Sequence, residues 1–300
     1  MSVAYDPGTG WTDPDAPEWL TANPPTGSPT DLPARGADRP STVRLTGLAA
    51  TGEGLPVPPP FLVVGSAGSS ASTTVAANLA SVIAADNAGY VYPAVVDATP
   101  AGGDLGVRAC DAHRTTSTMQ DWLDDSEPSL PSAVNAACGT TTAGALVLAR
   151  RGDDPLPGRE SLLSVHRHLV DAGVVPVYDA GAPIHAAAVR PFLYDPRIPV
   201  ALTVQARPDA INRLATVLRW LHRQFGEAVV GDVTIVVSHQ TPNVGPHDYA
   251  QHVRDYAGDW VNAVVAIPYD PHLAEGGEIT WVRIDPATQA AYRRLLGVMR

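Results

Sequence analysis

From residue 61 onward, short apolar runs rich in valine alternate with longer segments whose apolar residues recur at helical spacing. Continuous apolar runs are typical of strands that are buried on both faces of a parallel sheet. This alternation predicts an α/β fold with a doubly wound, mostly parallel sheet flanked by helices. Such sheets bind ligands at the carboxyl ends of their strands. The expected strands are residues 61–65, 91–97, 144–149, 174–178, 198–205, 232–238 and 261–267.

The segments between these runs are expected to be helices. The clearest is 208–225, because Ile211, Leu214 and Leu218 lie on one stripe at helical spacing. A final helix is expected after Asp285, a suitable N-cap residue, with Pro286 at the first helical position. The expected helices are residues 73–86, 115–124, 159–171, 184–193, 208–225, 246–257 and 286–299.

Residues 1–60 differ from the rest of the chain, since they hold 12 of the 29 prolines and no hydrophobic period. A segment that buries so little apolar surface cannot offset the entropy of ordering it, so we expect a disordered Pro/Gly-rich tail. Trp11, Trp19 and Leu20 are either incidental apolar residues or a short motif that docks on a partner. Residues 61–300 are expected to form the folded domain.

Composition narrows the classes of function. A net charge of −11 argues against broad nucleic-acid binding, which needs clustered positive charge, although it leaves room for a local arginine patch. Cys110 and Cys138 lack metal-ligand spacing, and a reducing cytoplasm is the expected location. The chain shows no signal peptide and no apolar stretch of about 18 residues, so no membrane span is expected. All 20 basic residues are arginine, which with the abundant alanine suggests a GC-rich, actinobacterial genome.

A loop of small residues joins the first expected strand to the first expected helix. Such a loop presents backbone N–H groups and the positive end of the helix dipole to an anion, which is the layout of a phosphate-binding P-loop. Thr73 stands where a hydroxyl would bind Mg²⁺, and the chain has no lysine to neutralise a phosphate. The alternative is that small residues simply allow close helix–strand packing. The candidate phosphate-binding residues are Gly65, Gly68, Ser69, Ser70, Ala71, Ser72, Thr73 and Thr74.

Residues 73–80, Thr-Thr-Val-Ala-Ala-Asn-Leu-Ala, resemble the first helix of the MinD/ParA family, the deviant Walker A P-loop ATPases. The loop of that family reads Lys-Gly-Gly-Val-Gly-Lys-Thr-Thr. When the two threonines are aligned, Ser72 takes the place of the phosphate-binding lysine. Ala67 takes the place of the second lysine, which reaches across an ATP-sandwiched dimer. The resemblance therefore implies a P-loop that has lost both charged contacts.

The resemblance continues in order along the chain to about residue 300. In residues 95–106, Asp97 matches the first aspartate of the family's second motif, and Thr99 replaces the aspartate that helps to orient the attacking water. In residues 174–183, Asp179 matches the Walker B aspartate associated with Mg²⁺. Ser238 and the following histidine replace an asparagine used for base contact, and residues 266–273 resemble the family's Ile-Pro-x-Asp segment.

Phosphoryl-transfer enzymes work mainly by positioning and by stabilising charge, so the missing lysines argue against normal activity. Arg108 and Arg207 are candidates to supply the missing charge, or are ordinary solvated arginines. The favoured hypothesis is a catalytically impaired positioning or scaffolding protein for chromosome or plasmid partitioning, the division site, pili or secretion machinery. Its partners would be proteins, bound through the tail and the α/β domain, with a homodimer as one arrangement.

Two alternatives stay open. One is a slow Mg²⁺-dependent ATPase that binds nucleotide through backbone amides and Thr73, with ATP or ADP as the cofactor. In that enzyme Thr73, Asp97 and Asp179 would hold Mg²⁺. The other is an ATP-independent partition protein that binds DNA through Arg213 and Arg219, which is not favoured by the acidic composition.

Overall fold

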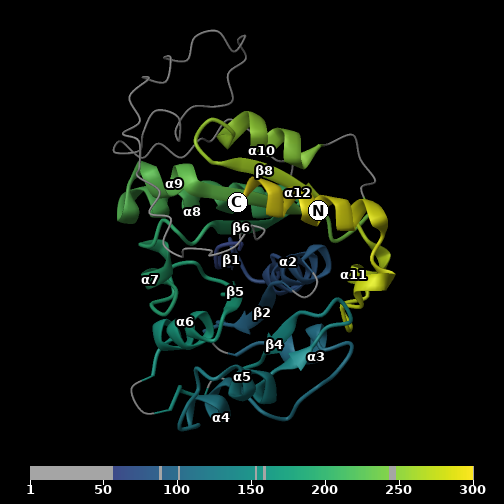
Figure 1. The fold of residues 1–300 in the computed structure, drawn as a ribbon. Helices are drawn as coiled ribbons and strands as arrows, with labels where there is room; N and C mark the ends of the chain where they lie inside the picture. Colours follow the sequence, from purple (N-terminus) through teal and green to yellow (C-terminus); the bar gives the residue numbers. More distant parts are fainter. Residues whose placement is uncertain are drawn as a thin grey trace. The chain divides into compact units, whose positions relative to one another are not determined.

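The computed structural model describes residues 57–299 except 88–89, 101, 153, 158–159 and 243–247. Of the expected tail, only residues 57–60 are described, and Trp11, Trp19 and Leu20, the candidates for a docking motif, lie outside the described residues. Residues Pro58–Arg300 form one compact unit built around a sheet (Figure 1). In this part of the chain no helix is long and apolar enough to cross a membrane.

The described residues form one eight-stranded sheet with the strand order β3-β4-β2-β5-β1-β6-β7-β8. Every pairing is parallel except that of β3 with β4, so the predicted doubly wound, mostly parallel sheet is confirmed. All seven expected strands are present, and only the two-residue edge strand β3 was missed. The strands are β1 (Phe61–Gly65), β2 (Tyr92–Asp97), β3 (Gly139–Thr140), β4 (Leu146–Leu148), β5 (Val174–Asp179), β6 (Val200–Gln205), β7 (Val233–Ser238) and β8 (Ala263–Ile267).

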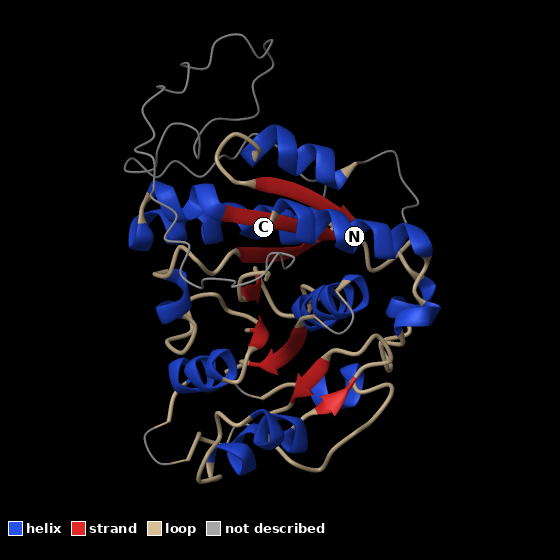
Figure 2. Ribbon diagram, viewed as in Figure 1, coloured by secondary structure: helices blue, strands red, loops and turns tan. Residues whose placement is uncertain are grey.

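Helices connect the strands and cover both faces of the sheet (Figure 2). Each expected helix has a counterpart, but several short helices were not foreseen. The helices are α2 (Ser72–Asp86), α3 (Leu105–Ala109), α4 (Met119–Leu123), α5 (Pro131–Ala137), α6 (Leu162–Asp171), α7 (Arg190–Leu193), α8 (Pro208–Phe225), α9 (Glu227–Asp232), α10 (Tyr249–Ala257), α11 (Pro271–Ala274), the 3-10 helix η1 (Trp281–Arg283) and α12 (Pro286–Val298).

Two expected helices differ most from the observed ones. The prediction for 184–193 was wrong over its first six residues, because this stretch forms turns in which Ala186 N donates to Pro183 O and Val189 N donates to Ala186 O. Helix α7 begins only at Arg190, with a proline in its first turn, where no backbone N–H is needed. The prediction for 115–124 was wrong before Thr118, whose side chain caps α4 in a reciprocal capping box with Asp121.

Alternate residues of each strand enter two separate cores. On β1, Phe61 and Val63 pack with α2, α3 and α12, whereas Leu62 and Val64 pack with α4–α8 and α10. The last helix, α12, is capped as expected, since Asp285 Oδ1 accepts from Ala287 N at 2.7 Å. The two cysteines, Cys110 and Cys138, are free and buried, and burial raises their pKa values to about 11 and about 12.

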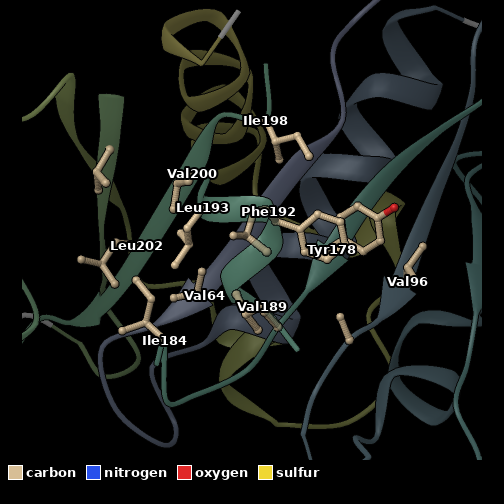
Figure 3. Close-up of a cluster of buried hydrophobic side chains, with 14 of the residues drawn as sticks. Val64, Val96, Tyr178, Ile184, Val189, Phe192, Leu193, Ile198, Val200 and Leu202 are labelled. Carbon is tan, nitrogen blue, oxygen red and sulfur yellow. The ribbon is translucent and has the colours of Figure 1, made fainter. Parts of the chain in front are cut away.

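An aromatic contact anchors β5 on the face of the sheet that packs with α4–α8. Tyr178 stacks on Phe192 of α7 with ring centroids 4.5 Å apart, among the apolar side chains in Figure 3. The Tyr178 hydroxyl lies 2.9 Å from His166 Nδ1 on α6. Because Tyr178 is fully buried, this packing fixes the strand end that carries the next residue, Asp179.

Candidate functional site

A cavity of about 450 Å³ opens at the carboxyl ends of β1, β7 and β8, above the N-terminus of α2. This is the edge at which a doubly wound sheet is expected to bind its ligand. Most of the predicted phosphate-binding residues line it; Gly65 lies just before the loop at the end of β1. The lining residues are Ala67, Gly68, Ser69, Ser70, Ala71, Ser72, Thr73, Thr74, Arg108, Gly181, Ala182, Ser238, His239, Gln240, Ile267, Pro268, Asp270, Leu273, Ala274, Gly276 and Tyr292.

The loop keeps a backbone shape that favours glycine at two positions where glycine is absent. Ser69 has φ 62° and Ala71 has φ 69°, both in the left-handed region. These two residues align with two glycines of the MinD/ParA loop. Ala71 is also the N-cap of α2, and among the described residues no side chain caps this helix end. The first N–H groups of α2 are therefore available to an acceptor in the cavity.

Neighbouring strands hold the loop in this shape. Gln205 and Gln240 both donate to the Ser69 carbonyl, at 2.6 and 2.9 Å. Thr203 Oγ1 donates to Ser70 Oγ at 3.0 Å. A Cβ on Gly65 would lie 2.1 Å from Ser70 Oγ, so this position needs glycine for close approach rather than for its backbone angle. Specific contacts therefore hold residues 65–74, which we call the cradle, in a defined shape.

The two predicted aspartates lie side by side and are fully buried. Asp97 ends β2, Asp179 ends β5, and the two are partners in the sheet register. Thr73 Oγ1 donates to Asp179 Oδ2 at 2.5 Å, and Gly181 N donates to Oδ1 at 3.2 Å. Burial raises the pKa of Asp179 to about 6, against the lowering effect of the Thr73 hydrogen bond and with a further rise from Asp97.

Asp97 is enclosed by its own following loop. Its Oδ1 accepts from Thr99 N at 3.1 Å and from Thr99 Oγ1 at 2.6 Å, while its Oδ2 accepts from Gly103 N at 2.9 Å. Thr99 therefore donates its hydroxyl proton to Asp97. The resemblance implies an aspartate at this position that orients the attacking water. Thr99 has no carboxylate with which to do so.

The two candidate arginines lie in different places. Arg108 of α3 lines the cavity, and its Nη2 donates to Thr74 Oγ1 at 3.2 Å. Arg207 does not reach the site; it is the N-cap residue of α8, more than half exposed, and its Nε lies 2.8 Å from Asp209. Arg213 and Arg219 also lie on α8 and do not line this cavity.

Several site residues were missed by the sequence analysis. Gln205 is the last residue of β6, and Gln240 lies two residues after the end of β7. A polar side chain at the carboxyl end of a buried strand was the available signal. Arg150, just after β4, donates to Thr99 O at 2.8 Å and so supports the loop around Asp97. Nothing in the local sequence indicated that contact, which joins residues 51 positions apart.

The residues of this site supply some, but not all, of the groups that a phosphate-bearing ligand and a hard cation need. The uncapped N-terminus of α2 supplies N–H donors, and Thr73 with Asp179 supplies the oxygen ligands that Mg²⁺ prefers. No group of three His, Cys, Asp or Glu suited to a metal occurs among the described residues, so the remaining ligands would be phosphate and water oxygens. When bound, Mg²⁺ would neutralise phosphate charge. In the described lining, Arg108 and His239 are the basic side chains, and burial lowers the pKa of His239.

No protein-family model and no curated protein sequence matches this chain. Solved structures do match. A ParA family ATPase from Chlorobium tepidum is 13% identical over 81% of this chain and 92% of its own, with a TM-score of 0.53. Apo McdA of Cyanothece is 12% identical over 80% and 99%, with a TM-score of 0.54.

The MinC:MinD cell division protein complex of Aquifex aeolicus contains a further match, 17% identical over 79% of this chain and 96% of that chain, with a TM-score of 0.51. At these identities the likeness shows the fold. The predicted resemblance is therefore confirmed at the level of a ParA/MinD-type P-loop NTPase fold.

Proposed function

We propose that this chain is a catalytically impaired protein of the MinD/ParA type, which acts as a positioning or scaffolding partner and does not turn over ATP. One observation carries the proposal: the shape of the phosphate-binding loop is retained, but the lysines and the aspartate that would support hydrolysis are absent. Its shape survives even at Ser69 and Ala71, where the backbone is strained. The chain has no lysine, and Ser72 occupies the aligned position.

The remaining polar groups support this reading. Stabilising charge on a transferred phosphate is the main contribution of such sites, and removing one oriented donor typically slows a reaction by about 10²- to 10³-fold. Here two lysines are absent. The Thr99 hydroxyl is also donated to Asp97, so it does not replace the aspartate that orients water. Three losses together leave little catalytic power.

Positioning requires a partner, and one protein of similar fold was solved with one. The MinD of Aquifex aeolicus was solved in a complex with MinC. We infer protein partners here as well, bound through the α/β domain and the N-terminal segment of residues 1–60, with a homodimer as one arrangement. A cytoplasmic location suits this role, and the choice among chromosome, plasmid, division-site, pilus and secretion cargo follows from the partner.

A fluorescent fusion expressed in the native cell tests the positioning role. We expect discrete or polar foci that persist in Asp179→Ala, because the pattern does not depend on turnover. A diffuse signal for the wild-type fusion, at native expression, would remove the proposal. Foci that disappear in Asp179→Ala would show that positioning needs the site's chemistry.

The slow Mg²⁺-dependent ATPase is the second candidate, favoured by the 2.5 Å contact between Thr73 and Asp179. Steady-state phosphate release from Mg-ATP separates the two functions. We expect release no faster than in the matched Asp179→Ala variant. Steady release that is lost in Asp179→Ala would establish the slow ATPase instead. DNA binding through Arg213 and Arg219 stays a prediction that gel shifts can test.

A further inference from the structure

We propose that Arg108 is the phosphate-binding cation of this site, so that the cavity binds a nucleoside di- or triphosphate without a lysine in the loop. The charge comes from α3 rather than from the loop. This inference rests on the proposed function in taking the cavity to be a binding site that does not hydrolyse its ligand.

Two hydrogen bonds hold the Arg108 guanidinium beside the first turn of α2, and a third anchors the Arg108 backbone. Its Nη2 donates to Thr74 Oγ1 at 3.2 Å, and its Nε donates to Gly277 O at 3.4 Å. The Arg108 carbonyl accepts from Ile279 N at 2.7 Å, which ties α3 to the segment before η1. The side chain is only 17% exposed. The cation is therefore presented to the cavity by an anchored backbone.

This placement brings a cation close to the N-terminus of a helix. The N-terminus of a helix carries a partial positive charge, which favours anions and repels cations. The first turn of α2 contains no acidic residue, and no side chain caps it among the described residues. The nearest carboxylate partner of Arg108 is Asp104 at 3.9 Å, whose side chain is 62% exposed and so gives little compensation.

A phosphate between the loop and Arg108 would satisfy both groups. It would accept from the first N–H groups of α2 on one side and from the planar guanidinium on the other. Arginine presents a fork of donors that matches phosphate geometry, whereas lysine acts as a point charge. The backbone N–H groups of α2 and the Arg108 guanidinium thus define a phosphate subsite that needs no charged side chain at the lysine position.

The rest of the cavity indicates what carries the phosphate. Ile267, Pro268 and Leu273 give its wall an apolar portion, and Ser238 and Gln240 add hydrogen-bonding groups beside it. A volume of about 450 Å³ falls within the range of small-molecule sites, roughly 300–1,000 Å³. A cavity that joins a phosphate subsite to an apolar wall with a few polar groups fits a nucleotide better than free phosphate.

Equilibrium binding of a fluorescent ADP analogue to the full chain, with Mg²⁺ present, tests the assignment. Arg108→Gln is expected to weaken binding by at least about tenfold, the usual loss for a charged hydrogen-bonding pair. The affinity of Arg108→Lys should lie between those of the wild type and Arg108→Gln, since lysine keeps the charge but lacks the planar fork of donors. Arg207→Gln is the matched control, because that exposed arginine lies outside the cavity, and it should bind like the wild type.

Competition identifies the ligand class. ADP and ATP should displace the analogue, pyrophosphate should do so more weakly, and adenosine should fail. Failure of the wild type to bind, or equal affinity in Arg108→Gln, would overturn the inference. If circular dichroism shows Arg108→Gln to be unfolded, Arg108→Lys decides, and equal affinity in that variant would overturn the role of the fork.

The same samples separate this inference from the proposed function. Binding without phosphate release supports both. Binding with steady phosphate release keeps the role of Arg108 but contradicts the impaired function. Absence of binding removes the role of Arg108 while the positioning role stands on its own localisation test.

Discussion

Replacing Ala71 with glycine should stabilise this protein, although glycine usually destabilises. Ala71 adopts φ 69° and is the N-cap of α2 without a capping side chain among the described residues. A non-glycine residue in the left-handed region costs roughly 1–2 kcal/mol. Alanine is also a poor N-cap, whereas glycine is tolerated there.

The gain is reduced by the freedom that glycine adds to the unfolded chain, about 0.4–1 kcal/mol. The net expectation for Ala71→Gly is therefore a rise of about 0.5–1 kcal/mol in the free energy of unfolding. For a domain of this size that raises Tm by about 1–4 °C. Differential scanning calorimetry at matched pH and ionic strength measures it directly.

Ala67→Gly is the matched control. Ala67 lies in the same loop, but it is not among the described residues with positive φ. Glycine there relieves no strain and should lower the stability by about 0.4–1 kcal/mol. If Ala71→Gly lowers Tm as much as Ala67→Gly does, the loop does not store the strain described above.

The remaining predictions concern the site and its support. Wild-type stability should fall relative to that of Asp179→Asn as pH rises from about 4 to about 6, by about 2–3 kcal/mol, because the unfolded carboxyl loses its proton near pH 4 while the folded carboxyl, with its pKa raised to about 6, still holds it; equal pH profiles of the two proteins in urea titrations would exclude this. Gly65→Ala should cost about 1–3 kcal/mol, and Gly65→Ala with Ser70→Ala should recover part of it, since the new Cβ meets Ser70 Oγ. Phe192→Ala should cost about 3–5 kcal/mol in chemical denaturation because it removes the ring stacked on Tyr178, and a loss below 1 kcal/mol would show that α7 is not part of the core.

The hydrophobic pattern of the sequence was enough to predict most of the strands and the longer helices. The valine-rich runs were visible because strands buried on both faces leave no polar positions, as in β1 and β7. The pattern failed at 184–193, where Ile184 and Val189 are buried in turns rather than on a helix. Short helices such as α3 and α5 leave too few residues for a period to be detected.

The site was less accessible to sequence reasoning because its geometry is tertiary. Arg108 and Arg207 were equivalent candidates in the sequence, and only the folding of α3 against the segment around Gly277 brings Arg108 to the cavity. The positive φ values of Ser69 and Ala71 could not be anticipated from serine and alanine, which rarely adopt them. Gln240 reaches Ser69 across 171 residues, a distance that no local pattern spans.

A single-turnover experiment tests the central claim most directly. Full-length protein in excess over labelled Mg-ATP would be quenched over several hours and the nucleotide separated by chromatography. The account predicts that ATP is recovered intact at the rate of a protein-free control. ADP that accumulates with wild type but not with Asp179→Ala would contradict it, because it would show that the site hydrolyses ATP without a lysine.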